Sequence, residues 1–501
     1  MEPCPMVYYR QEMGHSACRF ATRLRAWSRS DTGAAAPQER RRGRVTSVWQ
    51  SFKETFFPPV PEPLSKGMFH YMTPDGAEER FRVHLRVEND GEGILVINAA
   101  KVLHLNQTAT EHAKLLIEGK DTDAAVRELK RRYKVSPDRA REDYEHLRET
   151  ILTLATTDDI CPISYLDVQR IEPFDTPVSA PYRMDLALTY GCNADCGHCY
   201  VGRPRDMKSL STEQWKQVIE KLWDLGIPHA VFTGGEATVY PDLVELVRHA
   251  EDVGLVAGLL TNGIRLADKA YLGELVAAGL DHIQITLESH DEEIHNRMVG
   301  AEAWKATVQG IKNAVATDVY TITNSTLTTL NAPQFEKTID FLKDLGIETF
   351  ACNSLIYSGK GRSSGIGIPE TELESLMVRV RDKAVAKGMR LIWYTPTQYC
   401  EFHPVDLELG AKFCTAARYN MCIEPNGDVI PCQSYYSSLG NILRDDWDSI
   451  WNHPDAVGLR NRDWVMEKCR SCDELPLCGG GCPLYLQNEG TLCIESTSTA
   501  V

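Results

Sequence analysis

The chain has 501 residues, of which 43% are hydrophobic and 25% are charged, and these values are ordinary for a globular protein of two to four domains. It has no run that approaches the roughly 18 consecutive apolar residues of a membrane helix. The 54 basic and 70 acidic residues give a net charge of −16, which argues against a nucleic-acid binder held by phosphate contacts. We therefore expect a cytoplasmic protein with neither a membrane nor a nucleic acid as its partner.

Cysteine is the most informative residue type in the sequence. Three of the 16 cysteines fall between positions 192 and 199, and nine fall between 400 and 493. A secreted disulfide scaffold would be short and would carry a signal peptide, and the first 20 residues contain no apolar run of the kind that such a signal needs. Clustered cysteines in a large chain more often bind a metal or an iron–sulfur cluster.

Residues 1–50 are predicted to form a disordered basic tail. The first 45 residues carry nine arginines and four acidic residues, and they show no apolar period. An arginine-rich transit peptide is the alternative, and the acidic residues that interrupt the segment argue against it.

The segment 76–156 is predicted to be a small α+β domain that opens with strands. Residues 81–87 alternate between apolar and polar, as a strand with one buried face requires. A turn at 89–93 separates them from the apolar run 94–105, which predicts one or two further strands.

Three helices are predicted to follow these strands. Thr108 to Glu111 have the pattern of a capping box, so the first helix is expected to begin there, and Gly119 is expected to end it. The second helix covers about 123–133. Ser136 is the predicted N-cap of the third helix. That helix repeats apolar residues on one face, at Ala140, Tyr144, Leu147, Ile151 and Leu154.

After a proline-rich linker at 157–181, strands and helices alternate through residues 182–395. Six strands are predicted, at 184–189, 229–232, 255–260, 282–287, 319–326 and 349–356. Repeated strand–helix units require a parallel sheet with right-handed crossovers, so the fold class is α/β. Polar and glycine-rich signatures follow several of the strands, and the strand ends are where such sheets place their sites.

The first cysteine cluster, Cys192-x3-Cys196-x2-Cys199, follows a predicted strand directly. Three thiolates this close together can face one cubic iron–sulfur cluster. Because such a cluster has four irons, one iron stays open for another ligand, as in a catalytic metal site. The alternatives are a zinc knuckle, or three reduced thiols that lie near each other by chance.

Residues 182–395 resemble the radical S-adenosylmethionine (SAM) enzymes. The resemblance rests on this cysteine motif, on Gly234-Gly235-Glu236 after the second strand and on Thr261-Asn262-Gly263 after the third. The resemblance implies a partial (β/α)6 barrel in which the open iron chelates SAM and a 5′-deoxyadenosyl radical abstracts hydrogen from a substrate. That family usually has proline after the Glu, where this chain has Ala237. The SAM contacts that the resemblance implies are Gly234, Gly235, Glu236, Thr286, Glu288, Asn324 and Ser325.

Residues 396–495 are rich in cysteines and loops and have few long apolar periods, so we expect bound metal rather than a hydrophobic core to hold them together. Their pattern resembles the SPASM domain that follows many radical SAM barrels. The cysteines that carry the resemblance are Cys414, Cys432, Cys469, Cys472, Cys478, Cys482 and Cys493, with Gly427 four residues before Cys432.

The SPASM resemblance implies two auxiliary 4Fe–4S clusters, which would bring the total to three. The first would use Cys414, Cys432 and Cys482 with a fourth ligand from upstream. The second would use Cys469, Cys472, Cys478 and Cys493. Cys400 is the predicted fourth ligand of the first cluster, and Cys422 is the alternative. Clusters whose irons are all bound by protein would carry electrons rather than bind substrate.

The 76–156 domain resembles the small winged-helix peptide-binding domain typified by the pyrroloquinoline quinone peptide chaperone. The resemblance rests on the strands, on Leu105-Asn106-x-Thr108-Ala109 and on Gly119 with two further helices. Such domains bind a leader peptide as an extra strand on the edge of the sheet. A DNA-binding winged helix is the alternative, but the third helix mixes three arginines with four acidic residues, which does not suit a helix that faces phosphates.

Together these resemblances imply a radical SAM maturase that forms a crosslink, a thioether or an epimer in a ribosomally made peptide. A precursor peptide and an electron donor such as flavodoxin or ferredoxin are the implied partners. The runner-up is the modification of another protein or of a cofactor, such as sulfatase maturation or tetrapyrrole oxidation. Sulfatase maturases place an acidic base after the cysteine that corresponds to Cys432, where this chain has Gln433.

A third possibility is an electron-transfer or peptide-carrier module without catalysis, which the open three-cysteine motif disfavours. The residue that acts as acid, base or hydrogen donor is not assigned from the sequence.

Overall fold

The computed structural model describes residues 8–11, 62–74, 77, 79–157 and 178–489. They form two compact units, which we call the N-terminal unit (the described residues up to 157) and the C-terminal unit (those from 178). Most of the predicted tail at 1–50 and most of the predicted linker at 157–181 lie outside the described residues. No helix in the described part of the chain is both long enough and apolar enough to cross a membrane.

The N-terminal unit contains a five-stranded sheet in the order β1-β5-β4-β3-β2. Its strands are β1 (Tyr8–Gln11), β2 (Gly67–Met72), β3 (Arg82–Val87), β4 (Gly93–Ile97) and β5 (Lys101–Leu105). Strands β2 to β5 form an antiparallel meander, and β1 joins β5 in parallel. The strand predicted at 81–87 is confirmed, and the run 94–105 forms two strands. β2 was not predicted, because this edge strand exposes half of its residues and lacks a regular alternation.

Three helices follow the sheet: α2 (Gln107–Ile117), α3 (Thr122–Arg132) and α4 (Pro137–Thr156). The capping box predicted at Thr108–Glu111 is wrong. Asn106 is the N-cap of α2, and its side chain accepts a hydrogen bond from the Ala109 N–H, so Thr108 already lies inside the helix. Asparagine binds the free N–H groups of a first turn as well as serine does, so the helix begins two residues earlier than predicted.

The start and the buried face of α4 are confirmed. The Ser136 side chain accepts a hydrogen bond from the Arg139 N–H, and Pro137 takes the first helical position. The five apolar residues that repeat along the predicted helix are all buried. Apolar residues at one-face spacing therefore identify the face that α4 packs into the unit's core.

The C-terminal unit is built on a nine-stranded sheet in the order β12-β11-β10-β9-β8-β7-β6-β13-β14. Seven successive parallel strands form most of it: β6 (Arg183–Thr189), β7 (His229–Gly234), β8 (Val256–Thr261), β9 (His282–Thr286), β10 (Tyr320–Leu327), β11 (Thr349–Ser354) and β12 (Arg390–Trp393). The six predicted strands and the α/β class are confirmed. The seventh strand has only four residues, too few for a pattern to show.

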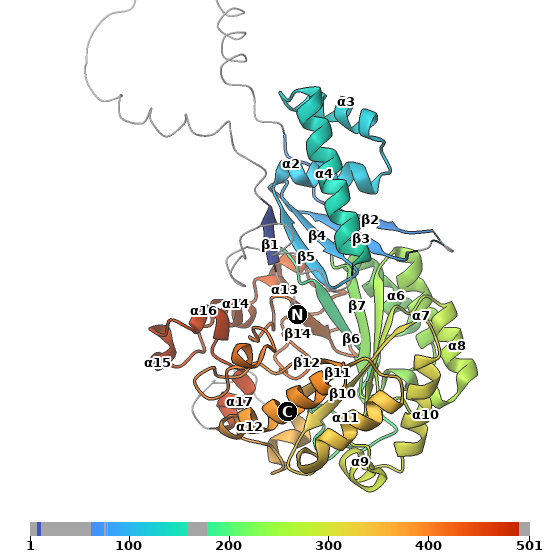
Figure 1. The fold of residues 1–501 in the computed structure, drawn as a ribbon, viewed down its shortest axis with the longest axis vertical. Helices are drawn as coiled ribbons and strands as arrows, with labels where there is room; N and C mark the ends of the chain where they lie inside the picture. The colour runs from blue at the N-terminus through green and yellow to red at the C-terminus, as the bar shows by residue number, and fades with distance from the viewer. Residues whose placement is uncertain (1–7, 12–61, 75–76, 78, 158–177, 490–501) are drawn as a thin grey trace, which may run out of the picture. The chain divides into compact units, whose positions relative to one another are not determined.

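Helices lie outside this curved sheet (Figure 1). They are α6 (Thr212–Asp224), α7 (Leu243–Val253), α8 (Lys269–Ala277), α9 (Glu292–Val299), α10 (Trp304–Val315), α11 (Phe335–Asp344) and α12 (Glu370–Ala386). Outward-facing residues of the strands, such as Met184, Leu186 and Leu188 on β6, pack against them in one continuous core. Because strand residues alternate, the intervening residues Asp185 and Ala187 face the interior of the barrel.

The cysteine-rich region continues the same sheet. β13 (Asn420–Ile423) pairs in parallel with β6, and β14 (Val429–Ile430) pairs antiparallel with β13. The expectation that this region lacks a hydrophobic core is wrong, because Met421, Ile423 and Val429, among others, belong to the core of the barrel. Short elements contribute these apolar side chains, so no long period shows in the sequence. The region's helices are α13 (Trp447–Trp451), α14 (Pro454–Asn461), α15 (Glu467–Arg470), α16 (Leu475–Cys478) and α17 (Pro483–Asn488).

Candidate active site

The loop that follows β6 carries the first cysteine cluster and is docked on the end of α9. The Asp195 N–H donates to the Val299 carbonyl at 2.9 Å, and the Gly197 N–H donates to the Met298 carbonyl at 3.0 Å. A Cβ on Gly300, which has a φ of +63°, would lie 2.4 Å from the Asp195 carbonyl oxygen. Glycine is therefore required at the position where the helix end meets the loop.

The three thiols of this loop lie close enough to affect one another. Burial raises the pKa of Cys196, and the thiols of Cys199 and Cys192, together with Glu288, raise it further. The opposite side of the loop is held by the Gly361 N–H, which donates to the Cys199 carbonyl at 3.2 Å. The backbone thus fixes the loop from two sides and leaves its thiols free to bind a metal.

The two glycine-containing motifs meet through the carboxylate of Glu236. This side chain is 2% exposed and accepts hydrogen bonds from the Thr261 hydroxyl at 2.7 Å and from the Asn262 N–H at 2.8 Å. It also accepts from the N–H and hydroxyl of Thr238. The Gly235 N–H donates to the Thr189 carbonyl at the end of β6. The carboxyl ends of β6, β7 and β8 are therefore joined into one rim beside the cysteine loop.

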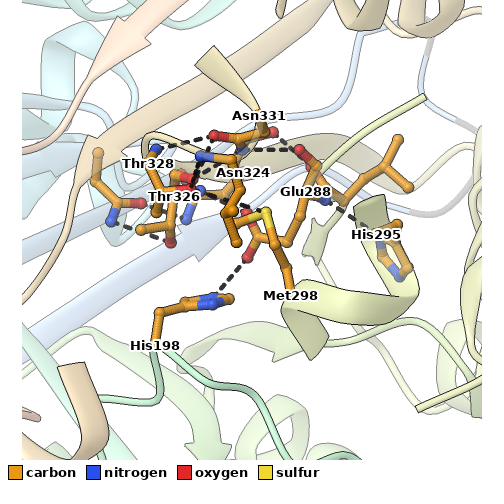
Figure 2. A network of polar contacts seen from close by, with 12 residues as sticks. His198, Glu288, His295, Met298, Asn324, Thr326, Thr328 and Asn331 are labelled. Carbon is orange, nitrogen blue, oxygen red and sulfur yellow. Dashed lines mark hydrogen bonds and ion pairs between the residues drawn. The ribbon is translucent and has the colours of Figure 1, made fainter. Parts of the chain in front are cut away.

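Figure 2 shows how Glu288, at the end of β9, connects the cysteine loop to the strands beside it. Its side chain is fully buried; one oxygen lies 2.9 Å from His198 Nε2, and the other accepts from the Thr326 N–H at 2.8 Å. Its backbone carbonyl accepts from Asn331 and its N–H donates to His295 Nδ1. Burial lowers the pKa of His198, but the Glu288 carboxylate outweighs burial and raises the pKa above its ordinary value.

His295, on α9, makes this network sensitive to acid. The side chain is 1% exposed, and burial lowers its pKa to about 4; Glu288 opposes this shift and His198 adds to it. The neutral form stabilises the fold above the unfolded pKa of about 6.5, and that stability is lost as the pH falls toward 4. We expect urea unfolding to show that the protein loses about 2 kcal/mol more between pH 7 and pH 5 than the His295→Gln variant. Parallel pH dependences of the two proteins would contradict this assignment.

Among the four predicted SAM contacts at strand ends, two are partly exposed and two are buried. Thr286 and Asn324 are paired in register on β9 and β10, are partly exposed, and face the interior. Ser325 points the other way, is 1% exposed, and bonds the Leu287 carbonyl. Glu288 is fully buried in the network of Figure 2. Exposure distinguishes Thr286 and Asn324 from the two buried residues, and a contact with SAM stays a prediction for all four.

A carboxylate that the sequence analysis missed lies inside the barrel. Asp185 on β6 is fully buried and accepts a hydrogen bond from Gln433 Nε2 at 2.7 Å; Arg183 forms an ion pair with it. The Tyr200 hydroxyl donates to Gln433 Oε1 at 2.6 Å. Because Tyr200 follows Cys199 and Gln433 follows Cys432, this chain of side chains links two cysteine loops. The sequence did contain a signal for this residue, because Asp185 is an aspartate at an inward position of an otherwise apolar strand.

The cysteines of the SPASM-like region form two groups. Burial raises the pKa of Cys414, and the thiols of Cys482 and Cys432 add to it. Burial also raises the pKa of Cys469, to which the thiols of Cys400 and Cys472 add. For Cys478, the added contributions come from Cys469 and Cys400. The predicted ligand Cys493 lies outside the described residues, as do Cys4, Cys18 and Cys161.

The alternative ligand Cys422 is buried on β13, where its thiol donates to the Ile423 carbonyl, and Cys352 is buried on β11. Within the described ranges, no three His, Cys, Asp or Glu side chains converge as ligands of a single metal ion. A cubic cluster makes a different demand, because each of its thiolates binds a different iron. The groups of neighbouring free thiols fit that demand.

Models of three protein families match this chain. The radical SAM superfamily matches residues 186–349, the SPASM iron–sulfur cluster-binding domain matches 414–473, and coenzyme PQQ synthesis protein D (PqqD) matches 92–151. The chain is a radical SAM enzyme. A radical SAM domain with a SPASM domain implies SAM and 4Fe–4S clusters, auxiliary ones included. Together, SAM and its cluster supply a 5′-deoxyadenosyl radical when bound.

Curated relatives of this radical SAM enzyme include two PqqA peptide cyclases. The protein from Bradyrhizobium diazoefficiens is 29% identical over 320 residues, which are 60% of this chain and 81% of the relative. The protein from Streptomyces rochei is 28% identical over 320 residues, which are 62% of this chain and 86% of the relative.

Solved structures with the same fold include Streptococcus suis SuiB. Its complex with the precursor peptide SuiA aligns with a TM-score of 0.60 at 17% identity, covering 85% of this chain and 96% of SuiB. Its complex with SAM aligns with a TM-score of 0.59 at 18% identity, and the alignment covers 82% of this chain and 96% of SuiB. At these identities the likeness shows the fold alone, and it spans both the N-terminal and the C-terminal units.

Proposed function

We propose that this radical SAM enzyme modifies a ribosomally made precursor peptide, in which it forms a crosslink, a thioether or an epimer. The observation that carries the proposal is the N-terminal unit, whose residues 92–151 match the PqqD model and whose sheet has an edge suited to an extended peptide. The names of the relatives support it, since they are PqqA peptide cyclases, and SuiB was solved with a precursor peptide.

The edges of the sheet in the N-terminal unit suggest where a leader peptide would add. The β5 edge pairs with an extended segment of the chain itself, with Tyr8 opposite Val102 and Gln11 opposite Leu105. The other edge is β2, which exposes Tyr71 and Met72 by 37% and 44%. On an edge strand the backbone groups supply affinity, and neighbouring side chains supply the choice of sequence.

The C-terminal unit offers the reacting part of the peptide a polar interior. Thr286 and Asn324 line it beside the cysteine loop, and Asp185 and Gln433 lie on the side of the SPASM cysteines. The reductive cleavage of SAM consumes one electron, so the proposal includes a donor such as flavodoxin or ferredoxin and a place in the cytoplasm. The auxiliary clusters are proposed to carry electrons.

Modification of another protein by proton abstraction is the second candidate. Gln433 cannot serve as a base, since a neutral amide does not accept a proton as a carboxylate does. Asp185 Oδ2 lies 2.7 Å from Gln433 Nε2, so a carboxylate is nevertheless present at this place. This contact gives sulfatase-type chemistry a candidate base.

Peptide binding by the full chain tests the proposal. We expect one of the short peptides encoded beside this gene to bind saturably at micromolar or lower concentration, which corresponds to about 8 kcal/mol or more. A chain lacking residues 1–11 is expected to bind that peptide several-fold more tightly if the leader uses the β5 edge, because its own strand no longer competes. Fluorescence anisotropy of labelled peptides measures both affinities.

Two controls make the binding experiment decisive. A scrambled peptide of the same composition should not bind. The Tyr71→Ala variant should bind normally if β5 is the docking edge and weakly if β2 is. If none of the neighbouring peptides binds, the peptide proposal fails, and modification of another protein or of a cofactor becomes the leading function.

A further inference from the structure

The surface beside the cysteine loop carries a group of exposed cations, although the whole chain has a net charge of −16. We propose that a small acidic carrier protein docks on this surface and delivers one electron to the cluster bound by Cys192, Cys196 and Cys199. The carrier is oxidised by one electron, which reduces the cluster, and no bond forms or breaks in this step. The inference rests on the electron donor named in the proposed function and adds the place where it binds.

The outer side of the cysteine loop is open to solvent. Gly197, between the second and third cysteines, is exposed, and a Cβ placed on it would meet no atom within 4 Å. Asp195, in the same loop, is 60% exposed. A carrier protein seated on this side would therefore touch the loop that holds the thiols.

Two segments bring cations to the open side of the loop. Arg205 forms an ion pair with Asp195 at 2.5 Å, and Lys360 forms a second ion pair with the same carboxylate. Arg205 is 45% exposed and Lys360 is 50% exposed. One carboxylate thus gathers two cations, and the three side chains together keep one positive charge.

The backbone fixes the segment 358–364 against the loop. A Cβ on Gly359 would lie 2.7 Å from the Cys199 carbonyl oxygen, so the two backbones are in close contact. The Ser358 hydroxyl donates to the Ser434 carbonyl at 2.9 Å, which ties the same segment to the SPASM-like region. The cations of this segment therefore keep their place beside the cysteines.

Further cations on these segments have no acidic partner. Lys208, three residues after Arg205, and Arg362, two residues after Lys360, are exposed and form no ion pair with any described residue. Arg297 is exposed in the last turn of α9, the helix on which the loop is docked. These side chains are available to carboxylates of another protein.

The charge of this surface is opposite to that of the chain. We call the exposed charged residues of 195–208, 297–302 and 358–364 the basic patch. Its cations outnumber its acidic residues by two, and its members are Arg205, Lys208, Arg297, Lys360, Arg362, Asp195, Asp206 and Glu302. A basic patch on an acidic protein attracts and orients an acidic partner, and it repels other copies of the chain less than it attracts that partner.

Binding of a flavodoxin, an acidic one-electron carrier, tests the docking surface directly. The variant Lys208→Glu/Arg362→Glu reverses two charges and removes no ion pair of the cysteine loop. We expect the reconstituted variant to bind flavodoxin about 10-fold more weakly than the parent enzyme at low ionic strength, measured by surface plasmon resonance. The two affinities should converge at about 1 M salt, where the Debye length is only about 3 Å.

Two control variants separate the basic patch from the charge of the whole chain. Lys208→Arg/Arg362→Lys keeps both charges and should bind flavodoxin as the parent does. Lys312→Glu/Arg444→Glu reverses two charges elsewhere and should also bind normally. Lys312 lies in the last turn of α10, and Arg444 lies in the loop 442–445, to which the last turn of α6 donates hydrogen bonds. The last turns of these helices lead to the amino ends of the strands, away from the cysteine loop.

Formation of 5′-deoxyadenosine without any peptide gives a second readout. The charge-reversal variant is expected to need about 10-fold more flavodoxin for its half-maximal rate, and to match the parent when dithionite is the reductant. Equal binding of flavodoxin by the variant and the parent overturns the inference. So does an equal loss of rate with both reductants, which would place the defect in the cluster site. A parent that cleaves SAM with dithionite but does not bind flavodoxin overturns both this inference and the proposed donor, and leaves the peptide proposal standing.

Discussion

Replacing Cys196 with alanine is expected to abolish the formation of 5′-deoxyadenosine from SAM. Cys196 is the middle ligand of the three-cysteine loop, and two thiolates do not hold a cubic cluster with one open iron. The variant should lose about one third of the iron of the fully loaded enzyme, because the two auxiliary clusters are held by other cysteines. We expect the yield of 5′-deoxyadenosine, measured by liquid chromatography after anaerobic reduction, to fall at least 100-fold.

Cys352→Ala is the matched control for this variant. Cys352 is buried on β11 and lies outside the three groups of cysteines, so its replacement should leave both iron content and SAM cleavage unchanged. Cleavage of SAM by Cys196→Ala at the rate of the parent enzyme would contradict the assignment of this loop as the SAM-cluster site.

Gly235→Ala is the second substitution for which a large effect is expected. An added Cβ would lie 2.4 Å from the Tyr190 carbonyl oxygen and 2.5 Å from that of Gly191, both of which are backbone atoms at the start of the cysteine loop. These backbone atoms cannot move aside as a flexible side chain can, so the carboxyl ends of β6 and β7 would have to separate. We expect SAM to bind at least 10-fold more weakly by equilibrium dialysis, and the free energy of unfolding to fall by about 1–3 kcal/mol.

Gly273→Ala offers the opposite case within the same unit. Gly273 lies in α8, and its added Cβ would meet no atom within 4 Å. Alanine favours a helix interior over glycine by about 1 kcal/mol, so this variant should be slightly more stable and should bind SAM normally. If both glycine variants behaved alike, the crowding at Gly235 would not be the cause of the effect.

The repeating units of the barrel could be predicted from the sequence because their signals are local. Six parallel strands show as apolar runs between amphipathic helices, and the cysteine loop and the two glycine motifs follow strands directly. The sequence also placed Glu236 and Thr261 at the ends of neighbouring strands. Their hydrogen bond at 2.7 Å is what such neighbours in a parallel sheet allow.

The contacts that organise the site could not be predicted in the same way, because they join residues far apart in the chain. The bond between His198 and Glu288 spans 90 residues, and the one between Asp185 and Gln433 spans 248. No spacing or period in the sequence encodes such pairs. The helix that supports the cysteine loop, α9, has only eight residues, and so it too escaped the pattern analysis.

The pairing of β13 with β6 limits how this enzyme can be truncated or recombined. Asn420 to Ile423 lie in register with Arg183 to Leu186. The edge of β6, the strand that leads to the cysteine loop, is therefore paired with a strand from the cysteine-rich region (396–495). Truncation before β13 would bare the hydrogen-bonding edge of β6, and bare edges recruit strands from other molecules and cause aggregation. A chimera that takes its cysteine-rich region from a related enzyme would therefore have to include this strand as well as the cysteines.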